Sequence, residues 1–202
     1  MTGIGVLVSG SGSNLQAILD AQARGELGGE VRVVISNVAG VRALERARAA
    51  NVPTRVLPHR EFASREAFDD ALVAALVEAR VEIVALAGFM RIVTRRVLDA
   101  FPGRVVNIHP SLLPAFPGLH AQRQALDYGA RVAGCTVHFV DEGCDSGPII
   151  AQAAVPVLDG DTEDALAARI LGEEHRVYPA ALRALAEGRV TVAGRRVILR
   201  PA

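Results

Sequence analysis

Short, continuous apolar runs alternate with amphipathic segments along the first half of this chain, and this alternation limits its fold more than any other feature. The runs that we expect to form strands are 4–9, 31–36, 54–58, 81–88 and 104–109. Strands that are apolar on both sides are typical of a parallel sheet covered by helices on both faces. The pattern therefore predicts an α/β fold with a Rossmann-like, mostly parallel twisted sheet.

The segments between these strands show helical spacing of their apolar residues. In 64–80, for example, Phe68, Leu72 and Leu76 share one face, and Ser64 is the expected N-cap. Further helices are expected over 13–24, over 40–51 and, shorter, over 94–101.

The pattern changes after residue 110. Two long apolar runs, 131–140 and 147–157, are separated by only a short polar loop, so we expect a mixed or antiparallel extension of the sheet. A long helix over 162–187 and a closing hairpin over 189–200 follow. We expect a single domain, 1–202, made of a Rossmann-like half, 1–110, and a second half, 111–202.

Composition excludes several classes of protein. The 22 basic residues, all arginine, balance 22 acidic residues, so the chain lacks the basic surface of a nucleic-acid-binding protein. No apolar run reaches the roughly 20 residues that a membrane helix needs. Two cysteines, Cys135 and Cys144, are too few for a disulfide framework, and we expect a cytoplasmic protein.

A glycine-rich loop, "VSGSGSNLQ", follows the first strand and opens the first helix. Its backbone N–H groups and the helix N-terminus suit a phosphate group. A dinucleotide is less suitable, because the third glycine of the dinucleotide motif would fall on Leu15 and the second strand ends without an acidic residue. The alternative is a tight strand-to-helix turn that binds no ligand.

Asn107 and His109 lie two residues apart at the end of an apolar strand and are followed by a proline-rich turn. Residues two apart on a strand point to the same side, so both side chains should face one point at the sheet edge where parallel sheets bind ligands. An amide and an imidazolium together suit an oxyanion, as in acyl transfer. The alternative is a pair that only caps the strand.

The polar loop "DEGCDSGP" supplies three carboxylates, Asp141, Glu142 and Asp145. One of them beside His109 would favour the charged imidazole, although the loop could also be an ordinary solvated turn. A zinc site made of Cys135, His138 and Cys144 is not expected, because Cys135 and His138 are three apart on a strand and face opposite sides. We therefore predict no metal site.

Several motifs occur in a recognisable order: "SGSGSNLQAI", "SREAFD", "LAGFMRIV", "NIHPSLLPAFPGLHA", "VHFVDEGCDSGPIIAQ" and "EEHRVYP". With them the chain resembles the phosphoribosylglycinamide formyltransferases of the folate-dependent formyltransferase superfamily, from residue 4 to about residue 179. "HPSLLP" alone marks only the superfamily. "SGSGSNLQAI" together with "HPSLLPAFPG" is more specific.

The resemblance implies the formyltransferase fold, a reaction and a set of site residues. Enzymes of this family transfer a formyl group from the co-substrate 10-formyltetrahydrofolate to the amine of glycinamide ribonucleotide in purine synthesis. The catalytic residues implied are Asn107, His109 and Asp145. Those implied for the phosphoribosyl substrate are Gly12, Ser13, Asn14 and Glu174, and those for the folate are Arg65, Met90, Arg91, Ile92, Val93 and Asn107.

Arg65 and Arg91 suit the carboxylates of a folate glutamate tail, although either could be an ordinary surface arginine. Cys144 departs from the family pattern, in which a branched aliphatic residue would be unsurprising. The expected partners are the two small molecules alone, with no nucleic acid and no membrane, and the protein is expected to be a monomer or a homodimer.

The sequence also bears on three alternative functions. A 10-formyltetrahydrofolate hydrolase usually has an N-terminal regulatory domain, whereas the first strand expected here starts at residue 4. A methionyl-tRNA formyltransferase would have an extra C-terminal domain and a basic RNA surface. A non-catalytic nucleotide-binding module would not need Asn107, His109 and Asp145 together.

Overall fold

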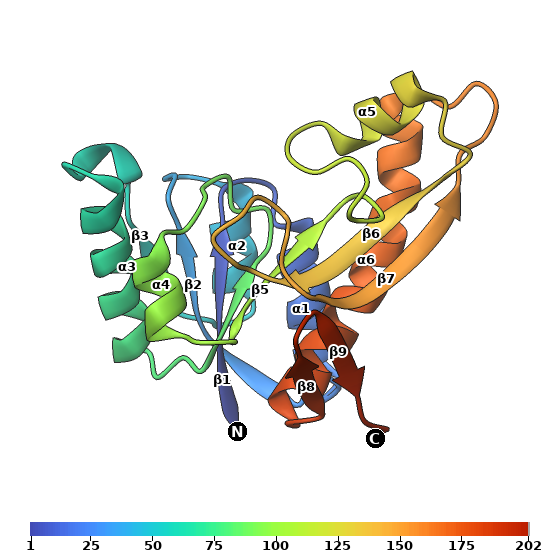
Figure 1. Ribbon diagram of the computed structural model, residues 1–202. Coiled ribbons are helices and arrows are strands. Elements are labelled where there is room, and N and C mark those ends of the chain that lie inside the picture. Colours follow the sequence, from blue (N-terminus) through green and yellow to red (C-terminus); the bar gives the residue numbers. More distant parts are fainter. Residues whose placement is uncertain (202) are drawn as a thin grey trace.

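The computed structural model, which describes residues 1–201, contains one seven-stranded sheet with helices on both faces (Figure 1). The strand order is β3-β2-β1-β4-β5-β6-β7. The parallel strands are β1 (Thr2–Val8), β2 (Gly29–Ser36), β3 (Thr54–Val56), β4 (Ile83–Leu86) and β5 (Val105–His109). The antiparallel strands are β6 (Val132–Phe139) and β7 (Ile149–Pro156). The predicted fold class is confirmed.

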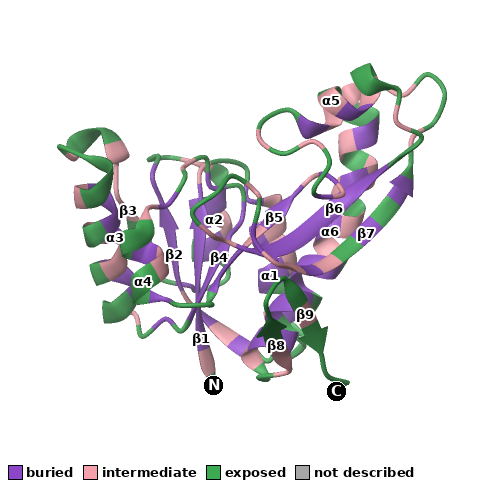
Figure 2. Ribbon diagram, in the orientation of Figure 1, coloured by how far each residue is buried: buried purple, intermediate pink, exposed green. Residues whose placement is uncertain are grey.

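The helices divide between the two faces of the sheet. The helices are α1 (Ser13–Ala23), α2 (Arg42–Ala49), α3 (Arg65–Glu78), α4 (Arg95–Ala100), α5 (Ala121–Tyr128) and α6 (Glu163–Ala186), with one short 3₁₀ helix (His59–Glu61). Side chains of α1, α2 and α6 pack in one buried cluster, and those of α3 and α4 pack in a second cluster on the opposite face. Buried residues follow the strands between the two layers (Figure 2).

The alternation of side chains along each strand explains why the core is divided between the two faces of the sheet. In β1, Ile4, Val6 and Val8 belong to the cluster under α1 and α6, whereas Leu7 belongs to the cluster under α3. All four side chains are fully buried, as expected for a strand with no solvated face.

Side-chain caps begin two of the helices, and the predicted cap at Ser64 is confirmed. Ser64 accepts a hydrogen bond from the Ala67 N–H at 3.1 Å, and Thr162 accepts one from the Ala165 N–H at 3.2 Å. The apolar pattern does not predict α5, because its buried residues, Ala121 and Ala125, are both small. The C-terminal hairpin, β8 (Val190–Ala193) and β9 (Arg196–Leu199), forms a separate two-stranded sheet, as expected.

Tyr178 fixes α6 over the middle of the sheet. Its side chain is fully buried, and its hydroxyl lies 2.8 Å from the Leu86 carbonyl and 3.2 Å from the Val106 carbonyl. The helix is thereby held against β4 and β5. One turn earlier on α6, Glu174 reaches the loop that follows β1. The packing of Tyr178 in the core therefore sets the position of Glu174 at the edge of the sheet.

No helix among residues 1–201 is long and apolar enough to cross a membrane.

Asp161 precedes α6 and is expected to stabilise the fold at neutral pH. Its carboxylate accepts two hydrogen bonds from Arg169, at 2.7 and 2.9 Å, and one from the Leu158 N–H at 2.8 Å. The hydrogen bonds from Arg169, first of all, lower the pKa of Asp161 to about 2. Asp161→Asn should therefore lower the melting temperature at pH 7.

The sign of the pH dependence follows from the lowered pKa. The stabilisation is complete above the ordinary pKa of an aspartate and is lost as pH falls towards about 2, so the difference between variant and wild type should shrink with acidification. Thermal unfolding followed by circular dichroism between pH 7 and pH 3 measures this. Asp159→Asn is the matched control, because Asp159 and its partner Arg131 are exposed and should contribute little. Equal shifts in the two variants would contradict the prediction.

Candidate functional site

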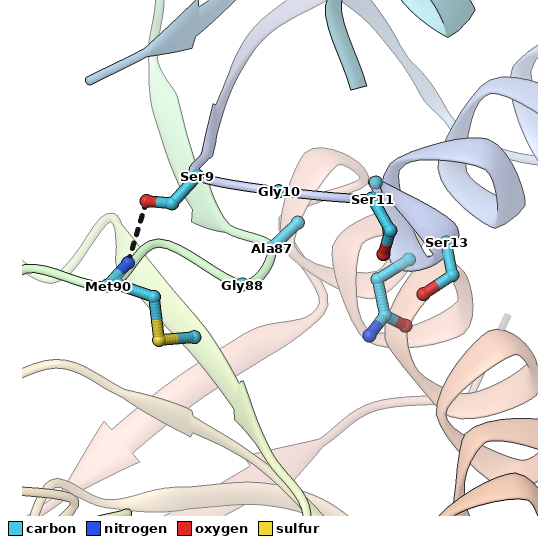
Figure 3. A pocket seen from close by; sticks show the side chains of 9 residues that line it. Ser9, Gly10, Ser11, Ser13, Ala87, Gly88 and Met90 are labelled. Atoms are coloured by element: carbon cyan, nitrogen blue, oxygen red, sulfur yellow. Dashed lines mark hydrogen bonds between the residues drawn. The ribbon is translucent and has the colours of Figure 1, made fainter. Parts of the chain in front are cut away.

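The loop between β1 and α1 forms a shallow pocket at the carboxyl edge of the sheet. Gly12, the N-cap residue of α1, has φ +72°, a conformation that favours glycine. The pocket has a volume of about 200 Å3 and is lined by Ser9–Asn14 together with Ala87, Gly88 and Met90 (Figure 3). No acidic side chain occupies the first turn of α1, so the free N–H groups of the helix start are available for an anion.

Asn14 and Glu174 meet beside this pocket. The Asn14 amide donates to the Glu174 carboxylate at 2.6 Å, and only 6% of Glu174 is exposed. Burial raises the pKa of Glu174, and the hydrogen bond from Asn14 opposes that shift. Within the described part of the chain, the buried Oδ1 atom of Asn14 has no hydrogen-bond partner. An acceptor is therefore left for a hydroxyl or amine of a ligand.

Gly12→Ala is expected to weaken phosphate binding. A Cβ atom at Gly12 would lie 2.7 Å from the Ala43 Cβ atom and 2.8 Å from its Cα atom, and the positive φ would add backbone strain. The loop would have to move away from α2, which we expect to raise the KM for a phosphorylated substrate by about tenfold or more. Steady-state kinetics measure this. Gly172→Ala is the control, because Gly172 does not line this pocket and a Cβ atom there meets nothing within 4 Å, and equal effects of the two changes would refute the argument.

The segment after β4 brings together the predicted folate residues. Met90 and Ile92 are exposed, although both are large and apolar, whereas Val93 is buried. Arg65, the first residue of α3, donates to the Ile92 carbonyl at 2.9 Å, and the Arg91 guanidinium lies 5.6 Å from the centre of the Phe68 ring. The Met90 N–H donates to the Ser9 hydroxyl at 2.8 Å, which joins this segment to the pocket (Figure 3).

Asn107, His109 and Asp145 lie in one cluster at the end of β5. The His109 Nδ1 atom is 3.3 Å from the Asp145 Oδ2 atom. The Asp145 carboxylate also accepts from the Gly118 N–H at 2.9 Å and, weakly, from the Cys144 thiol at 3.6 Å. His109 is 5% exposed, so this pair is largely shielded from water.

The His138 side chain completes the cluster, although the sequence assigned it no role beyond a zinc site that was not expected. It faces Asn107 across the antiparallel pair of β5 and β6, and its Nε2 atom is 3.3 Å from the Asn107 Nδ2 atom. The Nδ1 atom of His138 lies 2.8 Å from the Phe139 carbonyl, and its Nε2 atom also lies 3.7 Å from the Asp145 Oδ1 atom. His138 therefore contacts both the Asn107 amide and the Asp145 carboxylate through Nε2.

Several opposing effects act on the Asp145 carboxylate. Burial alone would raise its pKa, but the contact with His138, the Gly118 N–H and the charge of a protonated His109 together hold the pKa below its ordinary value. The carboxylate is therefore charged at neutral pH and can stabilise positive charge on His109.

Both ring nitrogens of His109 face acceptors. Nδ1 faces Asp145, and Nε2 lies 2.9 Å from the Phe116 carbonyl. Only the doubly protonated ring can donate to both. The cluster thus suits an imidazolium. Its Nδ1–H would face Asp145, and its Nε2–H would face the Phe116 carbonyl, a position that a ligand oxygen could take.

Two polar groups of the site, the loop after β1 and the cluster around His109, are separate. Among residues 1–201, no hydrogen bond links the loop residues Gly12–Asn14 to this cluster. The two groups lie at the ends of β1 and β5, on either side of β4. In the same described region no set of three or more His, Cys, Asp or Glu side chains could hold a metal ion.

Comparisons with known proteins show similarity in both sequence and fold. A family model described as formyl transferase matches residues 3–182. The chain is 48% identical, over 185 residues, to the phosphoribosylglycinamide formyltransferase of Escherichia coli K12, covering 92% of this chain and 87% of that protein. The crystal structure of glycinamide ribonucleotide transformylase 1 from Symbiobacterium toebii has a TM-score of 0.97 and 59% identity, covering 98% of this chain and 94% of that one.

A larger relative contains a similar region. The trifunctional purine biosynthetic protein adenosine-3 of Drosophila pseudoobscura pseudoobscura is 54% identical over 187 residues, which is 92% of this chain. The chain spans only 14% of the length of that protein.

Proposed function

The chain belongs to the formyl transferase family, and we propose that it transfers the formyl group of 10-formyltetrahydrofolate to the amine of N1-(5-phospho-D-ribosyl)glycinamide. The observation that carries this proposal is the cluster in which Asp145 lies 3.3 Å from His109 while Asn107 projects from the same strand. These groups suit a tetrahedral oxyanion formed by acyl transfer.

We propose that the phosphoribosyl substrate binds along the loop after β1. Its phosphate would accept from the backbone N–H groups of Gly12, Ser13 and Asn14 at the start of α1. Asn14 and the buried Glu174 lie next to this loop and offer oxygen atoms to the ribose hydroxyls. The glycinamide amine would then extend towards the end of β5.

The folate would bind beside the segment after β4. The exposed side chains of Met90 and Ile92 supply an apolar surface for the flat pterin. Arg65 and Arg91 lie at the edge of this surface and suit the carboxylates of the glutamate tail. Val93 is buried, so its contribution would come through the backbone and the packing of the segment.

The proposed reaction needs no covalent enzyme intermediate. The substrate amine attacks the formyl carbon, and the carbonyl oxygen becomes an oxyanion that accepts from the Asn107 amide and from Nε2–H of His109. That N–H leaves the Phe116 carbonyl when the oxyanion forms. The C–N10 bond then breaks, N10 receives the proton lost by the amine through a water held by Asp145, and tetrahydrofolate leaves.

One assay separates the proposal from its alternatives. The protein is incubated with 10-formyltetrahydrofolate, with and without glycinamide ribonucleotide, and loss of the formyl group is followed by absorbance. The proposal requires loss that depends on the amine. Equal loss without the amine would indicate a hydrolase, and no loss in either case would indicate a binding module.

The proposed setting is the cytoplasm. Both cysteines are free, Cys135 being buried and Cys144 exposed, which agrees with a reducing compartment.

A further inference from the structure

The C-terminal hairpin lies beyond residues 3–182, the region that the family model matches. It stands against the main sheet, near the ends of β6 and β7 (Figure 1). Val190 and Val197 pack on the main core cluster, and Arg200 donates to the Gly188 carbonyl at 2.6 Å. The hairpin base is thus fixed to the body of the protein, so its tip has a defined position.

The tip of the hairpin contacts the loop that carries Asp145. Gly194 and Arg195 form the two-residue turn, and Gly194 has φ +62°, as such hairpin turns favour. The Arg195 Nη2 atom donates to the Ser146 carbonyl at 2.7 Å. Ser146 directly follows Asp145, so the contact joins two segments 49 residues apart at the peptide next to the carboxylate.

The loop backbone at Asp145 needs external support. Asp145 has φ +51°, a left-handed conformation that a residue other than glycine keeps only when its surroundings hold it. Within the loop, Asp141 accepts from the Gly143 N–H at 3.1 Å and from the Ser146 hydroxyl at 2.6 Å. Arg195 contacts the backbone carbonyl of the same residue, Ser146, from outside the loop.

We infer that Arg195 is a positioning residue for the reaction, which holds the Ser146 peptide and thereby the Asp145 carboxylate against His109. This inference rests on the proposed role of Asp145. In the part of the chain that the structure describes, Arg195 has no ion-pair partner, so its contact with Ser146 is the interaction that orients its guanidinium. Losing the contact lets the loop relax and lengthens the His109–Asp145 contact.

The first test compares Arg195→Ala with Arg196→Ala. Arg196 is the neighbouring exposed arginine, and no hydrogen bond or ion pair of its side chain is found within residues 1–201. Arg195→Ala should lower kcat by about three- to tenfold, the size expected for losing one hydrogen bond of ordinary net strength at an exposed position. Arg196→Ala should leave kcat unchanged. The KM for glycinamide ribonucleotide should stay within about twofold in both variants, because the phosphate loop lies at another strand end.

Two further measurements separate positioning from a general effect on the fold. Arg195→Lys keeps a cationic donor and should restore part of the lost kcat. The melting temperature of Arg195→Ala should fall by no more than about 2 °C, as for most surface substitutions. An unchanged kcat in Arg195→Ala, or a loss of kcat matched by a large fall in melting temperature, would overturn the inference.

A double-mutant cycle with Asp145→Asn gives the sharpest result. If Arg195 acts through Asp145, adding Arg195→Ala to Asp145→Asn should cause no further loss in single-turnover rate. Losses that multiply would show that Arg195 acts elsewhere. If Asp145→Asn itself kept full activity, the proposed role of Asp145 would fail, which is a different outcome from failure of the inference alone.

Discussion

Replacing His109 with alanine is expected to lower kcat for formyl transfer by about 10²- to 10⁴-fold. The change removes the N–H that is proposed to stabilise the oxyanion and the group that can exchange protons with the reacting nitrogens. It also removes the imidazole that lies 3.3 Å from the Asp145 carboxylate in the wild-type protein. Single-turnover kinetics with saturating substrates measure the chemical step directly.

Substrate binding should survive this change. The phosphate loop at Gly12–Asn14 is attached to β1 and packs on α2, so it does not depend on His109. The dissociation constant for glycinamide ribonucleotide, measured by calorimetry, should therefore stay within about threefold. Turnover within tenfold of wild type would contradict the proposed role of His109, and a lost binding signal would show that the variant is misfolded.

The sequence predicts the central part of this site because local geometry determines it. Asn107 and His109 are two apart on a strand, and a strand has only two faces, so their shared direction follows from the apolar run around them. The same reasoning places the glycine-rich loop at the carboxyl edge, since β1 is a buried parallel strand. Both predictions depend on short stretches of chain.

His138 could not be predicted in this way, because its position depends on a register between distant segments. It lies opposite Asn107 only because β6 runs antiparallel to β5 with Asn107 paired to His138. In the sequence, 30 residues separate the two, and the intervening segment contains a helix, α5, that the apolar pattern does not reveal. From the sequence alone, His138 stands out only as one member of the set Cys135, His138 and Cys144, whose spacing does not suit zinc.

The contact between Asp145 and His109 illustrates a second limit of prediction from the sequence. A polar loop between two strands predicts carboxylates near the sheet edge but does not say which of the three faces inward. The structure brings Asp145 inward through its positive φ and through the Gly118 N–H, both of which are tertiary features. The resemblance to a family pointed to Asp145, the carboxylate that the structure places 3.3 Å from His109, whereas composition and spacing left all three possible.

Asp145→Asn tests whether the charge of this residue, rather than its shape, drives the reaction. Asparagine has nearly the same size and can still accept from the Gly118 N–H through its amide oxygen. It cannot stabilise a positive charge on His109 as a carboxylate does. We expect kcat to fall by about 10²- to 10⁴-fold, the upper figure being the loss of about 10⁴ that follows when the aspartate of a serine-protease triad becomes an amide.

The same variant should change stability in a direction set by the pKa of Asp145. That pKa is below its ordinary value in the folded protein, because the contacts with His138, Gly118 and His109 outweigh burial. The carboxylate therefore stabilises the fold above the ordinary pKa of an aspartate and loses this contribution as the pH falls further. Asp145→Asn should be less stable than wild type at pH 7, and the difference should narrow with acidification.

Activity and stability should therefore respond differently to pH. Unfolding by urea, followed by circular dichroism between pH 7 and pH 2, measures this difference in free energy, which should narrow only below the ordinary pKa of an aspartate. The kinetic defect should persist wherever both proteins are folded, because an amide carries no charge at any of these pH values. If the kinetic defect disappeared along with the stability difference, Asp145 would act mainly by holding the loop together, and a direct electrostatic role at His109 would be ruled out.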